Sequence, residues 1–299
     1  MPASRSGLLW GFVGVLAFSL TVPLTRVAVA GLSPLFIGAG RAAVPAVLAA
    51  VLLLATRSRR PRGRQWARVG VVALGVVLGF PLLTSYALTQ VPAAHGAVVI
   101  AILPAATAVI AALRARERPP VAFWVLAATG AAAAVGFAAV SGGGVGGLQW
   151  ADVLLFGAVL AAATAYAEGG MLARELGSWQ TICWALVVGF PLMAALAVVG
   201  WVQQPPTAGA GEWASFAYLA LVSMFLGFFA WYRGLGIGPM AQVSQVQLVQ
   251  PVLSLVWAAL LLGEELTVWT VLGGLVVIVC AALAVQVRLR QPSGSGRAA

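Results

Sequence analysis

Four side-chain amides lie within nine residues of one apolar segment and end directly before a proline: Gln242, Gln245, Gln247 and Gln250, followed by Pro251. Amides are costly in lipid, so we expect them to face protein or water. On a helix, Gln242, Gln245 and Gln250 fall within an arc of about 140°. Because an amide both donates and accepts hydrogen bonds, this face suits a zwitterionic or polyol solute. Hydrogen bonding to a neighbouring helix is the alternative interpretation.

Two charged residues, Arg41 and Glu168, lie inside other apolar segments. An intramembrane carboxylate predicts a proton carrier or a contact with a cation. In the alternative interpretation, Glu168 lies at the cytoplasmic end of its segment and is solvated near Arg174. Arg41 could clamp a substrate carboxylate, because its guanidinium group stays charged. The alternatives for Arg41 are a structural ion pair and a side chain that extends toward the outer surface.

Other polar residues extend the predicted substrate-binding set to Thr21, Tyr166, Tyr86 and Gln90. The last two are four residues apart and therefore share a helix face. The single histidine, His95, begins an apolar segment, where a proton role and an incidental position at a helix mouth are both open. The sequence holds no cluster of metal ligands, so we predict no metal site and no cofactor.

Two prolines lie near the middle of their apolar segments, Pro104 and Pro251. A proline lacks the backbone donor that would pair with the carbonyl four residues earlier, which here belongs to Ile100 or Gln247. Free backbone groups at membrane depth are tolerated only beside protein or a water-filled cavity. The pair therefore predicts two kinked helices that line a substrate path, with a purely structural kink as the alternative.

The composition identifies the class of protein that holds these residues. The chain is 62% hydrophobic and 8% charged, with a mean hydropathy of +1.02, too apolar for a soluble domain of 299 residues. Its apolar runs are continuous and do not alternate, which excludes a β-barrel. The net charge of +10 would suggest nucleic acid in a soluble protein. Here it is typical of basic loops that set membrane orientation, so no nucleic-acid partner is predicted.

The apolar runs predict an all-α polytopic membrane protein with ten transmembrane helices. The predicted spans are 8–29, 34–55, 67–88, 93–113, 120–140, 151–171, 179–201, 213–232, 240–262 and 267–287. A cleaved signal peptide over residues 1–30 is a weaker interpretation, because the run is too long and Arg26 interrupts it before the candidate cleavage site.

The arginines fix the orientation of the spans. With a cytoplasmic N-terminus, 15 of the 17 basic residues lie at the inner side, and only Arg26 and Arg41 do not. Cytoplasmic loops carry the excess of positive charge, which predicts that both termini lie in the cytoplasm. The chain is therefore predicted to be a multi-pass protein of the cytoplasmic membrane.

The second half of the chain repeats the first. Pro104 and Glu117 recur as Pro251 and Glu264, each 147 residues later, and Pro45 recurs 146 residues later as Pro191. The predicted division is a first five-helix repeat over 1–142, a second over 143–290, and a disordered cytoplasmic tail over 291–299. Because five is odd, the second repeat is inverted relative to the first, as in many secondary transporters.

At these residues the chain resembles the EamA-type branch of the drug/metabolite transporter superfamily, over nearly its whole length. The shared features are two five-span repeats, an arginine inside span two (Arg41), and an apolar–proline–apolar–glutamate pattern in spans four and nine. Span six departs from the pattern because it does not repeat Pro23 of span one. The resemblance implies a solute carrier, often an exporter of amino acids or other small metabolites. It also implies a central cavity among spans one to four and six to nine, with spans five and ten as a buttress.

We therefore predict a secondary transporter of small metabolites, most plausibly amino acids or similar amphipathic solutes, that works by alternating access with export favoured. Proton-coupled efflux of drugs or metabolites and passive, channel-like facilitation are the alternatives. An enzyme is not predicted, because the seven acidic residues are scattered and lysine is absent. The expected partners are a small-molecule substrate and the lipid bilayer, in a monomer or homodimer, with proton coupling through Glu168 left open.

Overall fold

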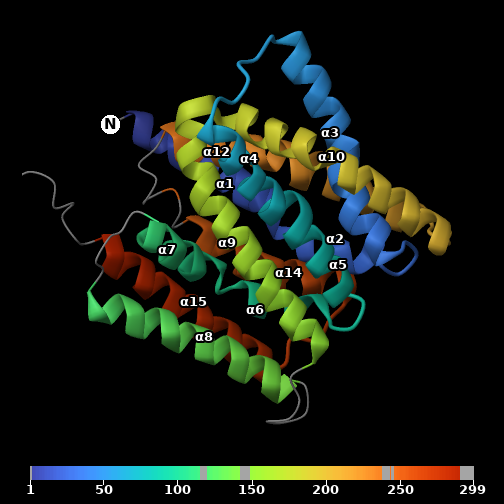
Figure 1. Cartoon of the computed structure of the whole chain (residues 1–299). Coiled ribbons are helices and arrows are strands. Elements are labelled where there is room, and N and C mark those ends of the chain that lie inside the picture. The colour runs from blue at the N-terminus through green and yellow to red at the C-terminus, as the bar shows by residue number, and fades with distance from the viewer. Residues whose placement is uncertain (1, 115–119, 142–148, 238–242, 244–245, 290–299) are drawn as a thin grey trace, which may run out of the picture.

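The computed structural model describes residues 2–114, 120–141, 149–237, 243 and 246–289, and every regular element in these ranges is a helix (Figure 1). The first half contains α1 (Pro2–Ser19), α2 (Thr21–Ala28), α3 (Pro34–Ala55), α4 (Arg64–Val72), the π-helix η1 (Ala73–Gly79), α5 (Phe80–Ala87), α6 (Ala93–Ile100), α7 (Leu103–Arg114) and α8 (Val121–Ser141). The second half contains α9 (Trp150–Leu176), α10 (Ser178–Gln203), α11 (Ala210–Ala217), the π-helix η2 (Tyr218–Leu226), α12 (Gly227–Ile237), the 3-10 helix η3 (Val246–Val249), α14 (Gln250–Leu262) and α15 (Val268–Leu289).

These helices form the ten predicted spans. Within the described ranges, nine stretches are apolar and long enough to cross a membrane, and a shorter apolar helix over Val246–Leu262 occupies the place of span nine. The prediction of an all-helical membrane protein with ten spans is thereby confirmed, and the cytoplasmic placement of both termini stays a prediction. The predicted division at residue 142 and the predicted disordered tail fall outside the described residues.

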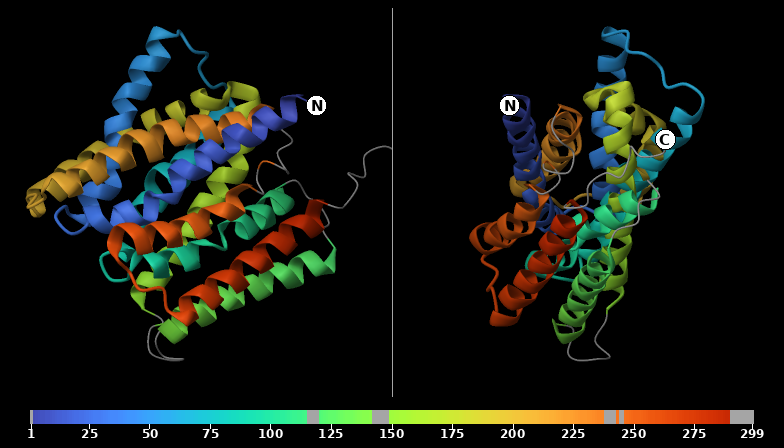
Figure 2. Two further views of the ribbon diagram at one scale, coloured as in Figure 1. Left: turned by 180° about the vertical axis from the view of Figure 1, so that it is seen from behind. Right: turned by 90° about the vertical axis from the view of Figure 1, so that its left-hand side faces the viewer.

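Helix packing follows the symmetry of an inverted repeat. Span one packs on span eight through α1 and α12, and its counterpart, span six, packs on span three through α9 and the run α4–η1–α5. Span two pairs with its own counterpart, span seven (α3 and α10), and span five with span ten (α8 and α15). Both views in Figure 2 show α8 and α15 side by side at one edge of the molecule. The two halves are therefore interlocked rather than placed side by side.

Spans three and eight both change from α- to π-helix in the middle. Shifting η1 by 147 residues places it on 220–226, inside η2, so the irregularity is itself repeated. A π-turn widens a helix locally and is frequent at functional sites. Spans three and eight are thereby irregular at the same depth, where they face the centre of the molecule.

We expect Gly75→Ala to destabilise the protein and Gly70→Ala not to. A Cβ at Gly75 would overlap the backbone oxygen of Ala161 and the Cβ of Ala165, whereas a Cβ at Gly70 meets nothing within 4 Å. Overpacking of this kind costs about 1–3 kcal/mol, so Gly75→Ala should unfold at a lower temperature in detergent. Both glycines lie in span three, which makes Gly70→Ala the control. Equal melting temperatures for the two variants would show that η1 and α9 do not pack this closely.

Candidate functional site

Spans four and nine are broken in mid-membrane. Span four stops at the end of α6 and restarts with α7 after a turn at 101–102, and Pro104 is the second residue of α7. Span nine passes from η3 into α14, where Pro251 is again the second residue. Proline fits the first turn of a helix, where no backbone donor is needed. Each predicted kink is thus placed at the start of a new half-helix.

A cavity lies where these half-helices begin. It is lined by Phe18, Thr21, Val22, Arg41, Val76, Phe80, Leu103, Tyr166, Ser223, Met224, Phe228 and Gln250. Leu103 is the first residue of α7, so one helix N-terminus, with its partial positive charge, opens onto it, and Gln250 lies where η3 passes into α14. The free space is about 20 Å³, which is room for about one water molecule. A solute can enter only if the surrounding helices move apart.

Arg41 is a buried cation in this cavity. The residue is 2% exposed, and its Nη2 donates to Ser223 Oγ at 3.4 Å. Ser223 Oγ in turn lies 2.8 Å from Thr21 Oγ1. Nε and Nη1 of Arg41 are buried and have no hydrogen-bond partner, and none of the acidic residues in the described ranges forms an ion pair with it. The described residues therefore leave this guanidinium with unused donors.

A second small cavity adjoins the first and shares Val22, Leu103 and Gln250 with it. Ile100 and Gln247, whose carbonyls lose their helical donor to Pro104 and Pro251, both line this second cavity. The side-chain oxygen of Gln250 and the side-chain nitrogen of Gln247 are buried without partners. Buried polar groups are normally hydrogen-bonded, so these amides offer one free acceptor and one free donor in the second cavity, and Gln250 also lines the cavity of Arg41.

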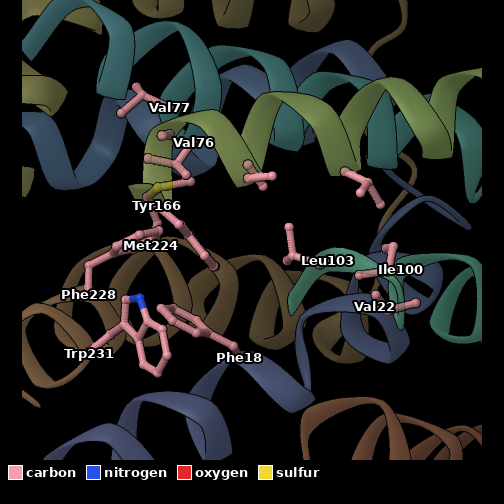
Figure 3. Close-up of a cluster of buried hydrophobic side chains, with 14 of the residues drawn as sticks. Phe18, Val22, Val76, Val77, Ile100, Leu103, Tyr166, Met224, Phe228 and Trp231 are labelled. Carbon is pink, nitrogen blue, oxygen red and sulfur yellow. The ribbon is translucent and has the colours of Figure 1, made fainter. Parts of the chain in front are cut away.

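Aromatic side chains form part of the wall of the main cavity (Figure 3). The Phe18 ring centroid lies 4.9 Å from that of Phe228 and 6.4 Å from that of Tyr166. Trp231 packs behind them, 6.0 Å from Tyr166. Aromatic rings offer a large apolar contact area. The cavity thus has a cationic, hydrogen-bonding side and an apolar side.

The predicted binding residues divide into three groups. Thr21, Arg41, Tyr166 and Gln250 all line the main cavity, although they come from four different spans. Tyr86 and Gln90 are both exposed and line neither of the two cavities, so their binding role stays a prediction. Gln242 and Gln245 lie outside the described residues. The sequence analysis did not single out Ser223, whose detectable signal was a hydroxyl in the middle of an apolar span.

Glu168 lies at the cytoplasmic ends of the spans. Its two carboxylate oxygens accept hydrogen bonds from Arg68 of span three and from Arg114 of span four, the latter from Nε at 3.0 Å. Arg68 also pairs with Glu175, which lies seven residues, or about two helical turns, after Glu168 in α9. The Glu168 side chain is 3% exposed, whereas that of Arg114 is 55% exposed. The structure thus gives Glu168 a place in an ion-pair network at the inner surface, and its predicted proton role stays a prediction.

A second polar cluster lies at the outer ends of spans four and six. His95 Nε2 is 2.6 Å from Asp152 Oδ1, and Asp152 Oδ2 accepts from the backbone N–H of Gln149 at 2.9 Å. The two oxygens of Glu264 accept from the N–H groups of Ala93 and Ala94, both at 2.7 Å. The sequence analysis missed Asp152, because an acid in the first turn of a helix is usually only a cap.

Comparison with known proteins agrees with this architecture. The model of the EamA-like transporter family matches residues 5–139 and again residues 149–286. The chain belongs to the EamA-like transporter family. It is therefore a transporter and a multi-pass protein of the cell membrane, with a small-molecule substrate and the lipid bilayer as its partners. The family implies a non-enzymatic function.

Individual relatives of this EamA-like transporter span most of its length. The chain is 43% identical to the uncharacterized transporter YdeK of Bacillus subtilis (strain 168), over 95% of this chain and 98% of that protein. It is 29% identical to a probable terminal-alkyne amino-acid exporter of Streptantibioticus cattleyicolor, over 90% of each. A crystal structure with 20% sequence identity matches at a TM-score of 0.63, over 96% of this chain and 99% of the other, which supports the fold alone.

Proposed function

We propose that this transporter exports amino acids, or amphipathic metabolites that likewise carry a carboxylate, by alternating access. The observation that carries the proposal is Arg41, a guanidinium buried in the central cavity with two nitrogens unused. A buried charge is costly unless it is paired, and a carboxylate is the partner that a guanidinium binds best. The N-terminus of α7 at the cavity adds to its affinity for an anion.

The rest of the cavity suits the other parts of such a solute. The free side-chain oxygen of Gln250 can accept a hydrogen bond from an amino group. Phe18, Met224 and Phe228 lie on the apolar side and can cover an aliphatic or aromatic side chain. The carboxylate of an amphipathic amino acid would thus pair with Arg41, and its apolar side chain would pack against the apolar residues of the cavity.

The name of one relative supports both the substrate class and the direction. The Streptantibioticus protein is named as a probable amino-acid exporter, and it aligns with this chain over 90% of both lengths. At 29% identity the two substrates need not be the same amino acid. The geometry of the cavity and the name of this relative support the same substrate class, a zwitterion with an apolar side chain.

Contacts at both membrane surfaces favour an alternating mechanism. Span four is held to α9 at the inner side by Arg114 and Glu168, and at the outer side by His95 and Asp152. The cavity between them has room for about one water. A carrier that passes through such an occluded state opens one side at a time, whereas a channel would hold a continuous path. The break in span four lets α6 and α7 move separately.

Counterflow in proteoliposomes tests the proposal. Vesicles preloaded with an unlabelled amino-acid pool should take up each labelled amino acid of the class in exchange. A carrier that releases labelled solute inside binds unlabelled solute there and carries it back to the outside. The matching amino-acid amides, which lack the carboxylate, should exchange at least about 30-fold more weakly, since a hydrogen-bonded charge contributes about 2 kcal/mol or more. Uptake that ignores the preload would identify a channel. Equal exchange of acid and amide would contradict the role of Arg41.

A further inference from the structure

The one histidine of the chain forms a buried pair with a carboxylate, away from the central cavity. His95 is 9% exposed and Asp152 is 1% exposed, and His95 Nε2 lies 2.6 Å from Asp152 Oδ1. The imidazole ring also contacts Phe137 of α8, with 5.2 Å between centroids. Neither residue lines the cavity, so the proposed solute site does not use them.

The charged groups around the pair are few. Glu264, which follows α14, binds the backbone N–H groups at the start of α6. Arg26 of α2 donates to the carbonyls of Leu88 and Thr89. The described parts of α8 and α15 bring no acid or base to His95, and Cys280 of α15 packs near Gly130 instead. Within the described residues, Asp152 is therefore the acidic group that can form an ion pair with a protonated His95.

The pair lies where an outer gate must open. His95 is in the first turn of α6, and Ile100, the last residue of α6, lines the cavity that adjoins Arg41. Asp152 belongs to α9 and Glu264 follows α14, both in the second half, so two carboxylates of the second half hold α6 of the first. A path from the cavity to the outside requires α6 to leave α9, and this breaks the contact between His95 and Asp152.

We propose that His95 and Asp152 form a proton-binding site that locks the outer gate, an inference that rests on the proposed alternating access. When the gate is open and His95 has left Asp152, the unprotonated ring nitrogen of the imidazole takes a proton from the outer solution. On closure the imidazolium then meets the carboxylate. Asp152 accepts a hydrogen bond from the N–H of Gln149 and lies in the first turn of α9, where the helix dipole favours a negative charge. A charge-assisted hydrogen bond is about twice as strong as a neutral one, so acid outside favours the closed gate.

Proton binding can be observed directly, because His95 is the only histidine. In untagged protein in lipid nanodiscs, NMR of labelled histidine should show a single imidazole. We expect it to be neutral near pH 8 and doubly protonated near pH 5. Asp152→Asn should reduce the protonated fraction at the acid end. The matched control is Glu212→Gln, which removes an acid with the same capping position in α11 and should change nothing. An imidazole with one protonation state across this range would overturn the proposal.

Exchange kinetics test the gate. In counterflow with the amino acid that wild type exchanges, we expect acid outside to slow the rate about fivefold or more, while acid inside has little effect. His95→Gln should exchange at a rate independent of the outer pH, and Glu212→Gln should behave like wild type.

Wild-type pH dependence retained in His95→Gln would overturn the proposal. Uphill accumulation driven by a proton gradient and lost in His95→Gln would assign the proton to coupling instead of the gate. If wild type exchanges no amino acid, the proposed function fails, and the NMR measurement still decides the proton site.

Discussion

Arg41→Gln is expected to reduce amino-acid exchange about 30-fold or more while leaving the solute-free protein as stable as wild type, or more so. The loss follows from removing the cation that pairs with the solute carboxylate, since truncating one partner of a buried charge pair costs about 2–5 kcal/mol. The gain in stability follows because the guanidinium is buried with Nε and Nη1 unused, and an unpaired buried charge is unfavourable.

The two effects together distinguish binding from structure. If Arg41 served mainly to hold helices together through Ser223, the glutamine variant would melt at a lower temperature. We expect instead that the variant keeps its melting temperature and loses only the extra stabilisation that a bound solute gives. Arg233→Gln is the matched control, because Arg233 stacks on Trp10 at 5.0 Å and lies outside the cavity. A large loss of exchange in that control would show that the assay responds to arginine content alone.

The internal repeat shows that Arg41 has no basic counterpart in the second half of the chain. The offset of 146 that relates Pro45 to Pro191 places Val187 at the position equivalent to Arg41. The offset of 147 likewise pairs Leu103 with Gln250 and Val76 with Ser223. The two halves supply equivalent backbone but different side chains, so the cavity is chemically asymmetric. This asymmetry gives a zwitterion one preferred orientation in the site.

Glu168→Gln is expected to open the inner side of the transporter. The substitution removes the negative charge and replaces one of the two oxygens that accept from Arg68 and Arg114 with an NH2 group that cannot accept. One hydrogen bond to a charged group, which contributes about 1.5–3 kcal/mol, is lost and the other is weakened. We therefore expect a cysteine placed in the cavity at Val76 to react at least about tenfold faster with a membrane-impermeant maleimide supplied from the cytoplasmic side. Cys183 and Cys280 would both be changed to alanine in this background so that only the new thiol reacts.

The control for this experiment lies in the same network. Glu175 also pairs with Arg68, but its side chain is 43% exposed, and exposed ion pairs contribute little. Glu175→Gln should leave labelling close to the wild-type rate. The predicted proton role of Glu168 makes a different forecast: unchanged labelling, with loss of the pH dependence of exchange in Glu168→Gln. Measuring the labelling rate and the pH dependence of exchange on Glu168→Gln distinguishes an ion-pair network that keeps the inner side closed from a proton carrier.

The amino-acid sequence by itself determined the number of spans, their orientation and their repeat. These features depend on local quantities. Burying an apolar segment in lipid is favourable whatever its neighbours are, and arginines hold loops in the cytoplasm one loop at a time. The prolines marked the breaks in spans four and nine for the same reason, since a missing N–H acts within one turn.

Only the tertiary structure decided which polar residues meet. Tyr86 and Gln90 looked as suitable as Thr21 and Tyr166, yet they are exposed and line neither cavity. The sequence gives the spacing of residues on a helix but not the rotation of the helix about its own axis. The partners of Glu168 are Arg68 and Arg114 rather than the nearby Arg174, and Asp152 meets His95 across 57 residues of chain. Such contacts depend on how helices pack, and the packing is set by side chains from the whole chain at once.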